Sequence, residues 1–281
     1  MAVAGFVTHS MRPDAAELRA ETIAWLRERG HDGRELVGEG GWRSDPPPTA
    51  MEGIDVAVSL GGDGTMLRAV DLCSSHGIPV LGVNLGHLGY LTTVEPADLV
   101  AALVRFINGD YILDARMMLE IVVRHRASGA ARLRRGALND LVLTRPAGVH
   151  TVQAALSLRG GPFLSYAADS LIVATPTGST AYNLSARGPI LAPSMRAMII
   201  TPVAPHMLFD RSLVLDDAEQ VQFSVTDSHP AELVVDGRAV GSLDPDEELV
   251  CTVGHDDALL VTFENRDFHR LLKRKFNLTD R

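Results

Sequence analysis

The first feature that could do chemistry is the pentapeptide Gly61-Gly62-Asp63-Gly64-Thr65, set between a predicted strand and a predicted helix. Glycines let a backbone approach a phosphate closely, and a helix start offers unpaired N–H groups and a favourable dipole. A carboxylate beside phosphates is repelled unless it orients a hydroxyl, accepts its proton or helps to hold Mg²⁺. The pentapeptide therefore predicts phosphoryl transfer to an alcohol with Asp63 as the catalytic residue. A Gly-Asp-Gly turn that needs positive φ is the structural alternative.

A second stretch, residues 175–183, is rich in hydroxyl groups and reads Thr-Pro-Thr-Gly-Ser-Thr-Ala-Tyr-Asn. Its hydroxyls are suited to grip a phosphate or a ribose. Tyr182 is suited to stack on a base, and Asn183 offers both a donor and an acceptor to a base edge. The structural alternative is a capped helix start, in which a hydroxyl caps the end and Pro176 sets the turn.

A polar pair, Asn139-Asp140, interrupts the otherwise apolar run Ala137–Thr144. Polar groups in such a run are costly unless they are paired. A carboxylate can accept two hydrogen bonds from a vicinal diol, so Asp140 is a candidate contact to a ribose, with Asn139 beside it. A turn at the end of a strand is the alternative for this pair.

Composition and missing motifs exclude several classes of function. The chain is 46% hydrophobic and 22% charged, as folded globular proteins are, and its net charge of −9 opposes sequence-independent binding to nucleic acid or to a membrane. It contains no GxxxxGK[ST], no GxGxxG, no HExxH and no Cys/His cluster, so no metal-ligating residues are predicted, while phosphate-held Mg²⁺ stays open. The two distant cysteines and the absence of a secretory leader predict a cytoplasmic location.

The first hundred residues alternate predicted strands with predicted helices, which is typical of a parallel sheet covered by helices. A helix opens at Pro13 and closes at Gly30, and residues 38–53 are expected to form a surface loop. A further helix is expected over Thr65–His76. The three expected strands are Val3–Thr8, Ile54–Leu60 and Pro79–Val83.

After about residue 110 the pattern changes to strand alternation, for example in Leu119–Val123, Val152–Leu158 and Val221–Val225. We place the boundary near Glu95-Pro96. The arginine-rich stretch Arg124–Arg135 predicts a solvated hairpin with its turn at Ser128-Gly129, and a polyphosphate dock is the alternative. A basic, partly apolar element is expected at Asp267–Phe276.

Taken together, three motifs resemble those of the NAD kinase family: GGDGT at 61–65, the Asn-acidic pair at 139–140, and TPTGSTAYNLSARGPI at 175–190. The segments 83–91 and 205–214 resemble family segments as well, so the likeness runs from about residue 54 to 240. It implies a Rossmann-like α/β domain over 1–95 and a β-rich, sandwich-like domain over 96–263. It also implies that about 264–281 returns to the first domain.

The resemblance implies phosphorylation of the 2′-hydroxyl of the adenosine ribose of NAD, giving NADP, with ATP or polyphosphate as donor and Mg²⁺ or another divalent cation. It also implies a homodimer or homotetramer. Asp63 matches the family's proposed general base. The positions implied to contact ligands are Gly61, Gly62, Gly64, Thr65, Arg68, Asn139, Asp140, Asp169, Thr177, Thr180, Ala181, Tyr182, Asn183 and Ser185.

Four positions depart from the family pattern. Ala167 stands where an arginine is common, and Ser170 and Arg187 stand where glycine is common. Arg238 replaces a common glutamine. Such departures suggest a paralogue with altered donor, substrate or affinity, but they leave the expected catalytic carboxylate in place.

Two other functions compete with NAD phosphorylation. Diacylglycerol and sphingosine kinases resemble the chain at GGDGT, but Asn-Glu follows their pentapeptide almost at once, whereas Met66-Leu67-Arg68 follows here. A non-catalytic sensor of NAD or NADP is the second alternative, motivated by Ala167 and Arg187. The intact Asp63 argues against it, because a sensor does not need a base.

Overall fold

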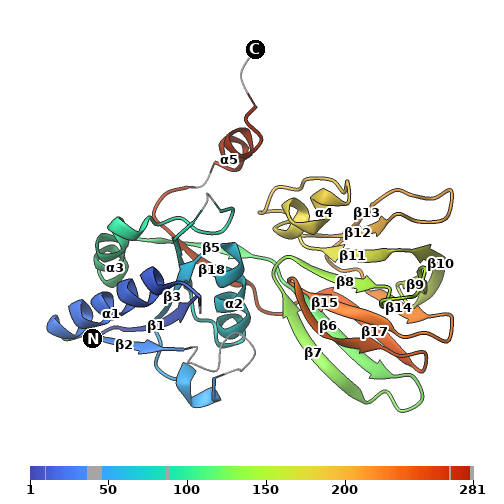
Figure 1. Ribbon diagram of the computed structural model, residues 1–281, viewed down its shortest axis with the longest axis horizontal. Helices are drawn as coiled ribbons and strands as arrows, with labels where there is room; N and C mark the ends of the chain where they lie inside the picture. Colours follow the sequence, from blue (N-terminus) through green and yellow to red (C-terminus); the bar gives the residue numbers. More distant parts are fainter. Residues whose placement is uncertain (10, 37–45, 87–88, 266, 279–281) are drawn as a thin grey trace. The chain divides into compact units, whose positions relative to one another are not determined.

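The computed structural model of the 281-residue chain describes residues 1–9, 11–36, 46–86, 89–265 and 267–278. These residues form two compact units: Met1–Ala115 with Ala258–Arg281, and Arg116–Asp257 (Figure 1). The first is an α/β unit with a parallel-containing sheet, and the second is an antiparallel β-rich unit. The predicted fold class is confirmed, including the return of the C-terminal segment to the first unit.

The bounds of the two units differ from the domain limits expected near residues 95 and 264. Helix α3 (Leu99–Ile107) buries Leu103 and Phe106 in the core of the first unit, so that unit continues past residue 95. Strand β18 (Ala258–Thr262) pairs with β4 (Val80–Asn84) of the same unit, so the chain returns before residue 264. Both differences arise because core packing and strand pairing, not the proline at 96, set the extent of a unit.

The sheet of the first unit has the strand order β2-β1-β3-β4-β18-β5. Its central strands are buried along their whole length, as expected for parallel strands covered on both faces. The three predicted strands and the first helix are confirmed. The bounds are β1 Val3–Thr8, α1 Pro13–Glu28, β2 Asp32–Glu35, β3 Val56–Gly61, α2 Asp63–Cys73, β4 Val80–Asn84 and β5 Ile112–Arg116.

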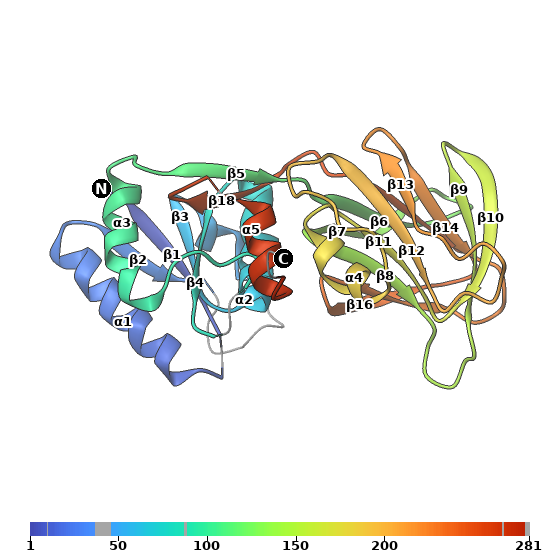
Figure 2. The ribbon, with the colours of Figure 1, turned by 90° about the horizontal axis from the view of Figure 1, so that it is seen from above.

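Helices α1 and α3 cover one face of this sheet and α2 covers the other (Figure 2). The alternation of side chains along the strands explains this arrangement. Val58 and Leu60 share a core with α1 and α3, while Gly82 faces α2, where a Cβ atom would lie 3.0 Å from the Met66 sulfur. Helix α2 begins at Asp63, two residues before the predicted start, so Asp63 lies in its first turn.

The carboxyl ends of β3 and β4 meet at one edge of the sheet. Gly61 is in register with Asn84, and the N–H of Leu85 donates to the carbonyl of Gly61 at 2.9 Å. The loop after β3 therefore lies beside the loop after β4, at the edge where open α/β sheets bind ligands. Within the predicted loop over 38–53, residues 38–45 lie outside the described residues and Pro48–Met51 form a 3₁₀ turn.

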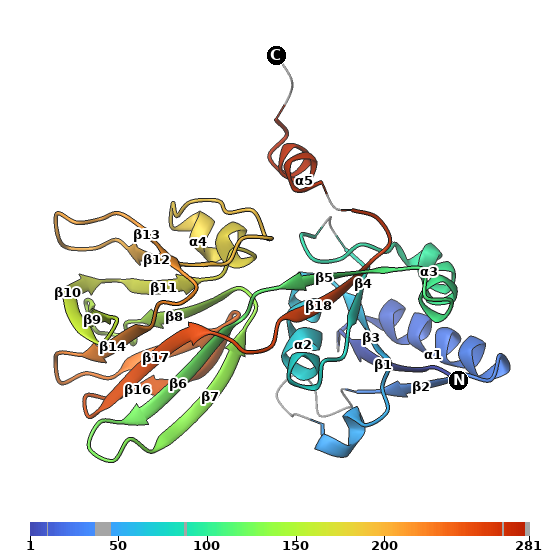
Figure 3. The same cartoon turned by 180° about the vertical axis from the view of Figure 1, so that it is seen from behind.

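The second unit is a sandwich of two antiparallel sheets, each of six strands (Figure 3). Their orders are β10-β9-β14-β17-β6-β7 and β13-β12-β11-β8-β15-β16, and both sheets contribute to one core. The strand alternation expected after residue 110 is confirmed. The bounds are β6 Leu119–His125, β7 Ala131–Ala137, β8 Asp140–Thr144, β9 Val152–Leu158, β10 Gly161–Ala168, β11 Ser170–Ala174, β12 Ala197–Val203, β13 Leu213–Asp216, β14 Val221–Val225, β15 Ala231–Val235, β16 Arg238–Leu243 and β17 Glu247–Val253.

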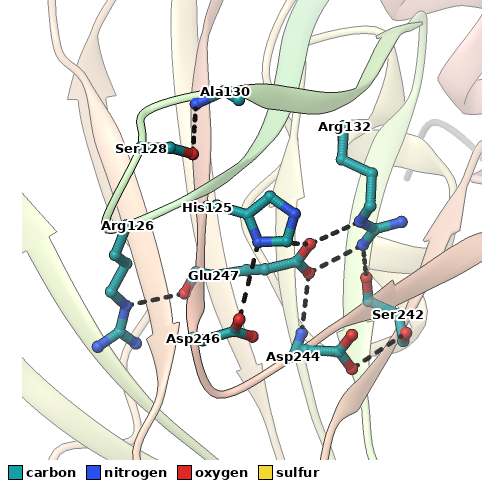
Figure 4. Close-up of polar contacts among 9 residues, drawn as sticks. All are labelled: His125, Arg126, Ser128, Ala130, Arg132, Ser242, Asp244, Asp246 and Glu247. Carbon is teal, nitrogen blue, oxygen red and sulfur yellow. Dashed lines mark hydrogen bonds and ion pairs between the residues drawn. The ribbon is translucent and has the colours of Figure 1, made fainter.

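The arginine-rich stretch forms the hairpin β6–β7, as predicted, with Gly129 at φ 70° in its turn. Beside this hairpin lies the buried Glu247, the first residue of β17 (Figure 4). Arg132 donates to both of its carboxylate oxygens, at 2.6 and 2.9 Å. This pairing holds the pKa of Glu247 below its usual range. Arg124 pairs with Glu248 and Arg134 with Glu120, so these two arginines form ion pairs at the surface of the sheet. A polyphosphate dock on this hairpin stays a hypothesis.

The remaining helical segments are short. The expected C-terminal element is helix α5 (Phe268–Lys275), whose first turn is capped by the Asp267 carboxylate, which accepts from the Arg270 N–H at 3.0 Å. No helix among the described residues is long and apolar enough to span a membrane. The other segments are α4 Tyr182–Ser185 and the 3₁₀ turns Ser74–His76, Pro96–Asp98 and Gly178–Thr180.

Candidate active site

The Asp63 carboxylate is held by the backbone that follows β4. The N–H of Tyr90 donates to Oδ2 at 2.9 Å, and the N–H of Leu91 donates to Oδ1 at 3.0 Å. Gly89 makes this contact sterically feasible, since a Cβ there would lie 2.3 Å from Asp63 Oδ1. The carboxylate is therefore fixed at the carboxyl edge of the first unit's sheet, half-exposed at the start of α2.

No positive φ angle requires the glycines on either side of Asp63. Gly61, Gly62 and Gly64 all lie outside the positive-φ region, so the turn alternative for the pentapeptide is wrong. Gly61 is required by packing, because a Cβ would lie 2.0 Å from the Thr65 hydroxyl. Around Gly62 and Gly64 a Cβ would meet no atom within 4 Å other than those of the adjoining residues and of the helix backbone itself. The space beside these two residues is open.

Two other predicted residues of α2 are buried. Thr65 is 1% exposed, and Arg68 is 2% exposed with its guanidinium 2.8 Å from the Asp71 carboxylate. The structure thus places Arg68 within the first unit, in an ion pair on its own helix. The contact of Arg68 with substrate phosphates stays a prediction, and it requires this buried guanidinium to become accessible.

In the second unit, the pair Asn139-Asp140 lies where β8 begins, so the strand-end position is confirmed. The Asp236 carboxylate accepts three backbone N–H groups there, from Leu138, Asn139 and Asp140, at 2.8, 2.8 and 3.0 Å. Asp236 itself lies in the two-residue turn between β15 and β16, with positive φ at Asp236 and Gly237. Asp236 was not among the predicted site residues, although the Asp-Gly dipeptide between two apolar runs signals this turn.

Asp140 is a buried acid with a perturbed pKa. Its side chain lies beside Asp236, and the residue is only 4% exposed. Burial and the charge of Asp236 raise the pKa of Asp140 to about 7, against a weaker opposing hydrogen bond from the backbone N–H of Tyr182. A carboxyl group that exchanges its proton near neutral pH is typical of a functional site.

The hydroxyl-rich segment packs directly onto the Asn139-Asp140 pair. The Thr175 hydroxyl donates to the carbonyl of Leu138 at 2.5 Å and accepts from the Gly178 N–H at 3.0 Å. Gly178 is needed for this contact, since a Cβ would lie 2.0 Å from the carbonyl oxygen of Asn139. The fold therefore brings the two predicted binding segments of the second unit together.

Asn183 has a different role from the one predicted. It is fully buried, and its amide donates to the carbonyls of Ser179 and Pro189 at 3.1 and 3.0 Å. Its oxygen accepts from the Thr201 hydroxyl at 2.7 Å. The predicted contact of Asn183 with a base edge is wrong, because its donors and acceptor already hold the turn together.

The neighbours of Asn183 remain accessible. Tyr182 is 43% exposed, Ser185 is exposed, and Thr180 and Ala181 are partly exposed. Thr177 is 7% exposed, and its hydroxyl accepts from Arg116 at 3.4 Å. The helical turn at 182–185 thus buries one polar side chain for structure and presents the others at the surface.

Asp169 lies between β10 and β11 and is half-exposed. Arg145 donates to its carboxylate at 3.0 Å, so a cation stands beside Asp169 even though Ala167 supplies none. The departure at Ser170 is also accommodated, since its buried hydroxyl lies 2.7 Å from the Thr144 hydroxyl. Asp169 therefore has a cationic neighbour, and the hydroxyl of Ser170 has a hydrogen-bond partner.

Arg187 occupies a left-handed position in the turn after α4, with φ 64° and an exposed side chain. A residue with a Cβ is strained there, and glycine is not. Arg187→Gly is expected to raise the free energy of unfolding by about 1 kcal/mol, measured by chemical denaturation. Arg187→Ala keeps the Cβ and should give no such gain; an equal gain for both variants would show that φ is not the cause.

Two family models cover most of the chain. The model described as the ATP-NAD kinase N-terminal domain matches residues 7–111, and the ATP-NAD kinase C-terminal domain matches residues 138–263. The chain belongs to the NAD kinase family. It is 38% identical to an NAD kinase of Heliobacterium modesticaldum, with 98% of both chains covered. It is 41% identical to an NAD kinase of Carboxydothermus hydrogenoformans, with 82% of both covered.

Solved structures agree with this family at the level of the fold. A yeast NADH kinase complexed with NADH matches with a TM-score of 0.88 at 24% identity, covering 100% of this chain and 89% of that one. An NAD kinase from Archaeoglobus fulgidus in complex with ATP matches with a TM-score of 0.71 at 23% identity, covering 99% and 97%. Membership of the NAD kinase family makes the chain a phosphotransferase and disfavours the lipid-kinase and sensor alternatives.

Proposed function

We propose that this NAD kinase family member transfers a phosphoryl group from ATP or polyphosphate to the 2′-hydroxyl of the adenosine ribose of NAD, giving NADP. The observation that carries the proposal is the Asp63 carboxylate, held by two backbone amides beside open space at the start of α2. A fixed carboxylate of this kind is suited to orient an alcohol and to accept its proton.

The glycines supply the second part of the mechanism. Neither backbone strain nor packing among the described residues requires glycine at 62 or 64, so the lack of side chains there suits a ligand that approaches the backbone. The first amides of a helix have no partner within the helix and attract anions. In this mechanism the amides of the loop bind the donor phosphates while Asp63 accepts the proton of the 2′-hydroxyl.

A divalent cation fits this site together with the phosphates of the donor. Among the described residues, no group of three or more His, Cys, Asp or Glu side chains forms a metal site. Mg²⁺ commonly binds nucleotide phosphates with one or two carboxylates, and Asp63 is the carboxylate at the glycine loop. The ion, when bound with the donor, would neutralise charge on the transferred phosphoryl group.

The second unit supplies the dinucleotide-binding groups in this proposal. Asp140 and Asn139 contact the ribose and adenine, and the carboxylate of Asp169 serves the nicotinamide end. Support comes from the buried, proton-exchanging carboxyl of Asp140 and from the exposed residues beside it. The remaining proposed contacts are Thr177, Thr180, Ala181, Tyr182 and Ser185.

Tyr182 is the proposed stacking residue for the adenine base. Tyr182→Ala is expected to weaken NAD binding by about 5- to 100-fold, the range that loss of one base–aromatic stack produces. Calorimetric titration with NAD measures the effect. Tyr182→Phe keeps the ring and should bind as the parent does; an unchanged dissociation constant for the alanine variant would count against stacking.

We further propose a cytoplasmic homodimer or homotetramer. Both cysteines are free and buried, as suits a reducing compartment. Strands β10 and β13, which carry the exposed residues Phe163 and Val214, are sheet edges, and an unpaired strand edge can pair with another chain. Light scattering on the purified protein measures the assembly directly.

One assay tests the proposed reaction as a whole. The purified protein is incubated with NAD, Mg²⁺ and either ATP or polyphosphate, and NADP is read by a dehydrogenase that ignores NAD. Formation of NADP with either donor supports the proposal and identifies the donor. NAD binding without NADP would instead support a sensor, and phosphorylation of a lipid would support the other alternative.

A further inference from the structure

Helix α5 has one partly buried face and one exposed face. Phe268, Leu271, Leu272 and Lys275 are partly buried, while the other residues of the helix are exposed. The spacing of these four residues places them on one side of the helix. A lysine is therefore the last member of an otherwise apolar face. The helix dipole explains why cations occur in the last turn, but it does not explain why one of them lies on the partly buried face.

Lys275 contacts Tyr90. The Lys275 ammonium lies 4.7 Å from the centroid of the Tyr90 ring, a cation–π contact within the first unit. Tyr90 follows β4, far from α5 in sequence, so this contact joins the C-terminal helix to the loop at the carboxyl edge of the sheet. Burial and the nearby Asp63 charge raise the pKa of the Tyr90 phenol, which keeps the ring neutral beneath the ammonium.

Tyr90 is also one of the two residues whose amides hold Asp63. Its N–H donates to Asp63 Oδ2 at 2.9 Å, and the next residue, Leu91, donates to Oδ1. Gly89 completes the contact, because its Cα lies so close that a Cβ would come within 2.3 Å of the carboxylate. A displacement of residues 89–91 by an ångström would therefore move or release the carboxylate, and misplacements of that size can cost about 100-fold in rate.

We propose that Lys275 is a positioning residue for Asp63. Its ammonium holds the Tyr90 ring, and the ring fixes the segment whose amides orient the carboxylate. The C-terminal helix thereby becomes part of the reaction's machinery without touching either substrate. This inference rests on the proposed role of Asp63 as the base, and it adds that orienting the base depends on α5 being in place.

The kinetic test compares removal of the charge at two neighbouring positions of the helix. Lys275→Met is expected to lower kcat by about 3- to 30-fold, which corresponds to the free energy of one cation–π contact. The KM values for NAD and for the donor should not change. Arg274→Met removes the same charge from the exposed face and should behave as the parent does. Lys275→Arg should restore kcat, because a guanidinium also stacks on an aromatic ring.

The Tyr90 ring is tested in the same way. Tyr90→Phe keeps the aromatic face and should retain kcat, whereas Tyr90→Leu should lose as much as Lys275→Met. Combining Tyr90→Leu with Lys275→Met should cost no more than either change alone, since both remove one contact. Additive losses, or a raised KM for the donor with kcat unchanged, would overturn the proposal; the second result would make Lys275 a donor-binding residue.

A measurement without turnover separates this inference from the proposed function. Hydrogen exchange of the Tyr90 and Leu91 amides should be faster in Lys275→Met than in the parent and in Arg274→Met. The amides of Leu138 and Asn139, which bind Asp236 in the second unit, serve as the internal reference. Faster exchange in a chain that makes no NADP would support the contact and refute the reaction, and unchanged exchange would refute the contact.

Discussion

Asp63→Asn is expected to lower kcat by about 100- to 10,000-fold, while the dissociation constant for NAD stays within about threefold of the parent's. The amide has nearly the shape of the carboxylate but cannot accept the proton of the 2′-hydroxyl. It also loses one of two backbone contacts, because its NH₂ group cannot accept the N–H that one carboxylate oxygen binds. Part of the loss will therefore come from orientation.

The measurement for Asp63→Asn is steady-state production of NADP together with calorimetric titration of NAD. Glu52→Gln is the control, since Glu52 is an exposed acid of the same unit that precedes the amino end of β3, away from the glycine loop. Its kcat should equal the parent's. Undiminished turnover in Asp63→Asn would remove Asp63 from the role of base.

Asp140→Asn is expected to stabilise the chain as it weakens NAD binding. The folded pKa of Asp140, about 7, lies above its ordinary value of 3.8, so the fold disfavours the ionised form. The ionised Asp140 therefore lowers the free energy of unfolding of the parent, and this loss grows as pH rises from about 4 to about 7 and is constant above pH 7. Between pH 5 and 8 the stability advantage of the asparagine variant should grow by roughly 2–3 kcal/mol.

The ionised form of Asp140 destabilises the fold, but it should strengthen the binding of NAD. Ribose hydroxyls that donate to the carboxylate favour its ionised form, so the parent should bind NAD about tenfold more tightly at pH 8 than at pH 6. Asp140→Asn should bind more weakly and without this pH dependence. Calorimetric titrations at the two pH values measure both effects. A parent affinity that does not change with pH would argue against a ribose contact at Asp140.

The placement of these two acids in the chain was predictable from local pattern. A buried apolar run followed by glycines and a helical period indicates a parallel strand, a loop and a helix, and the structure has β3, the Asp63 loop and α2 there. Alternation with a period of two likewise predicted β6, β9 and β14. These features depend on residues close in sequence, and so the sequence carries them directly.

The partners of the two acids were not predictable in the same way. The amides that hold Asp63 come from Tyr90 and Leu91, after the next strand. The pKa of Asp140 is raised by burial and then by the Asp236 carboxylate, which comes from a distant hairpin. A sequence pattern shows which side chains are polar but does not show what each one faces. For the same reason, Asn183 looked like a ligand contact although its amide is satisfied inside the turn.

The sequence by itself determined the strand, loop and helix around Asp63, the change to strand alternation after residue 110, and the family. Only the tertiary structure decided that Arg68 is withdrawn into an ion pair, that Arg145 supplies a cation to Asp169, and that the C-terminal helix reaches Tyr90. The physical reason is that strand and helix periodicity are properties of consecutive residues. Burial, pKa and hydrogen-bond satisfaction depend on groups that approach one another only when the chain has folded.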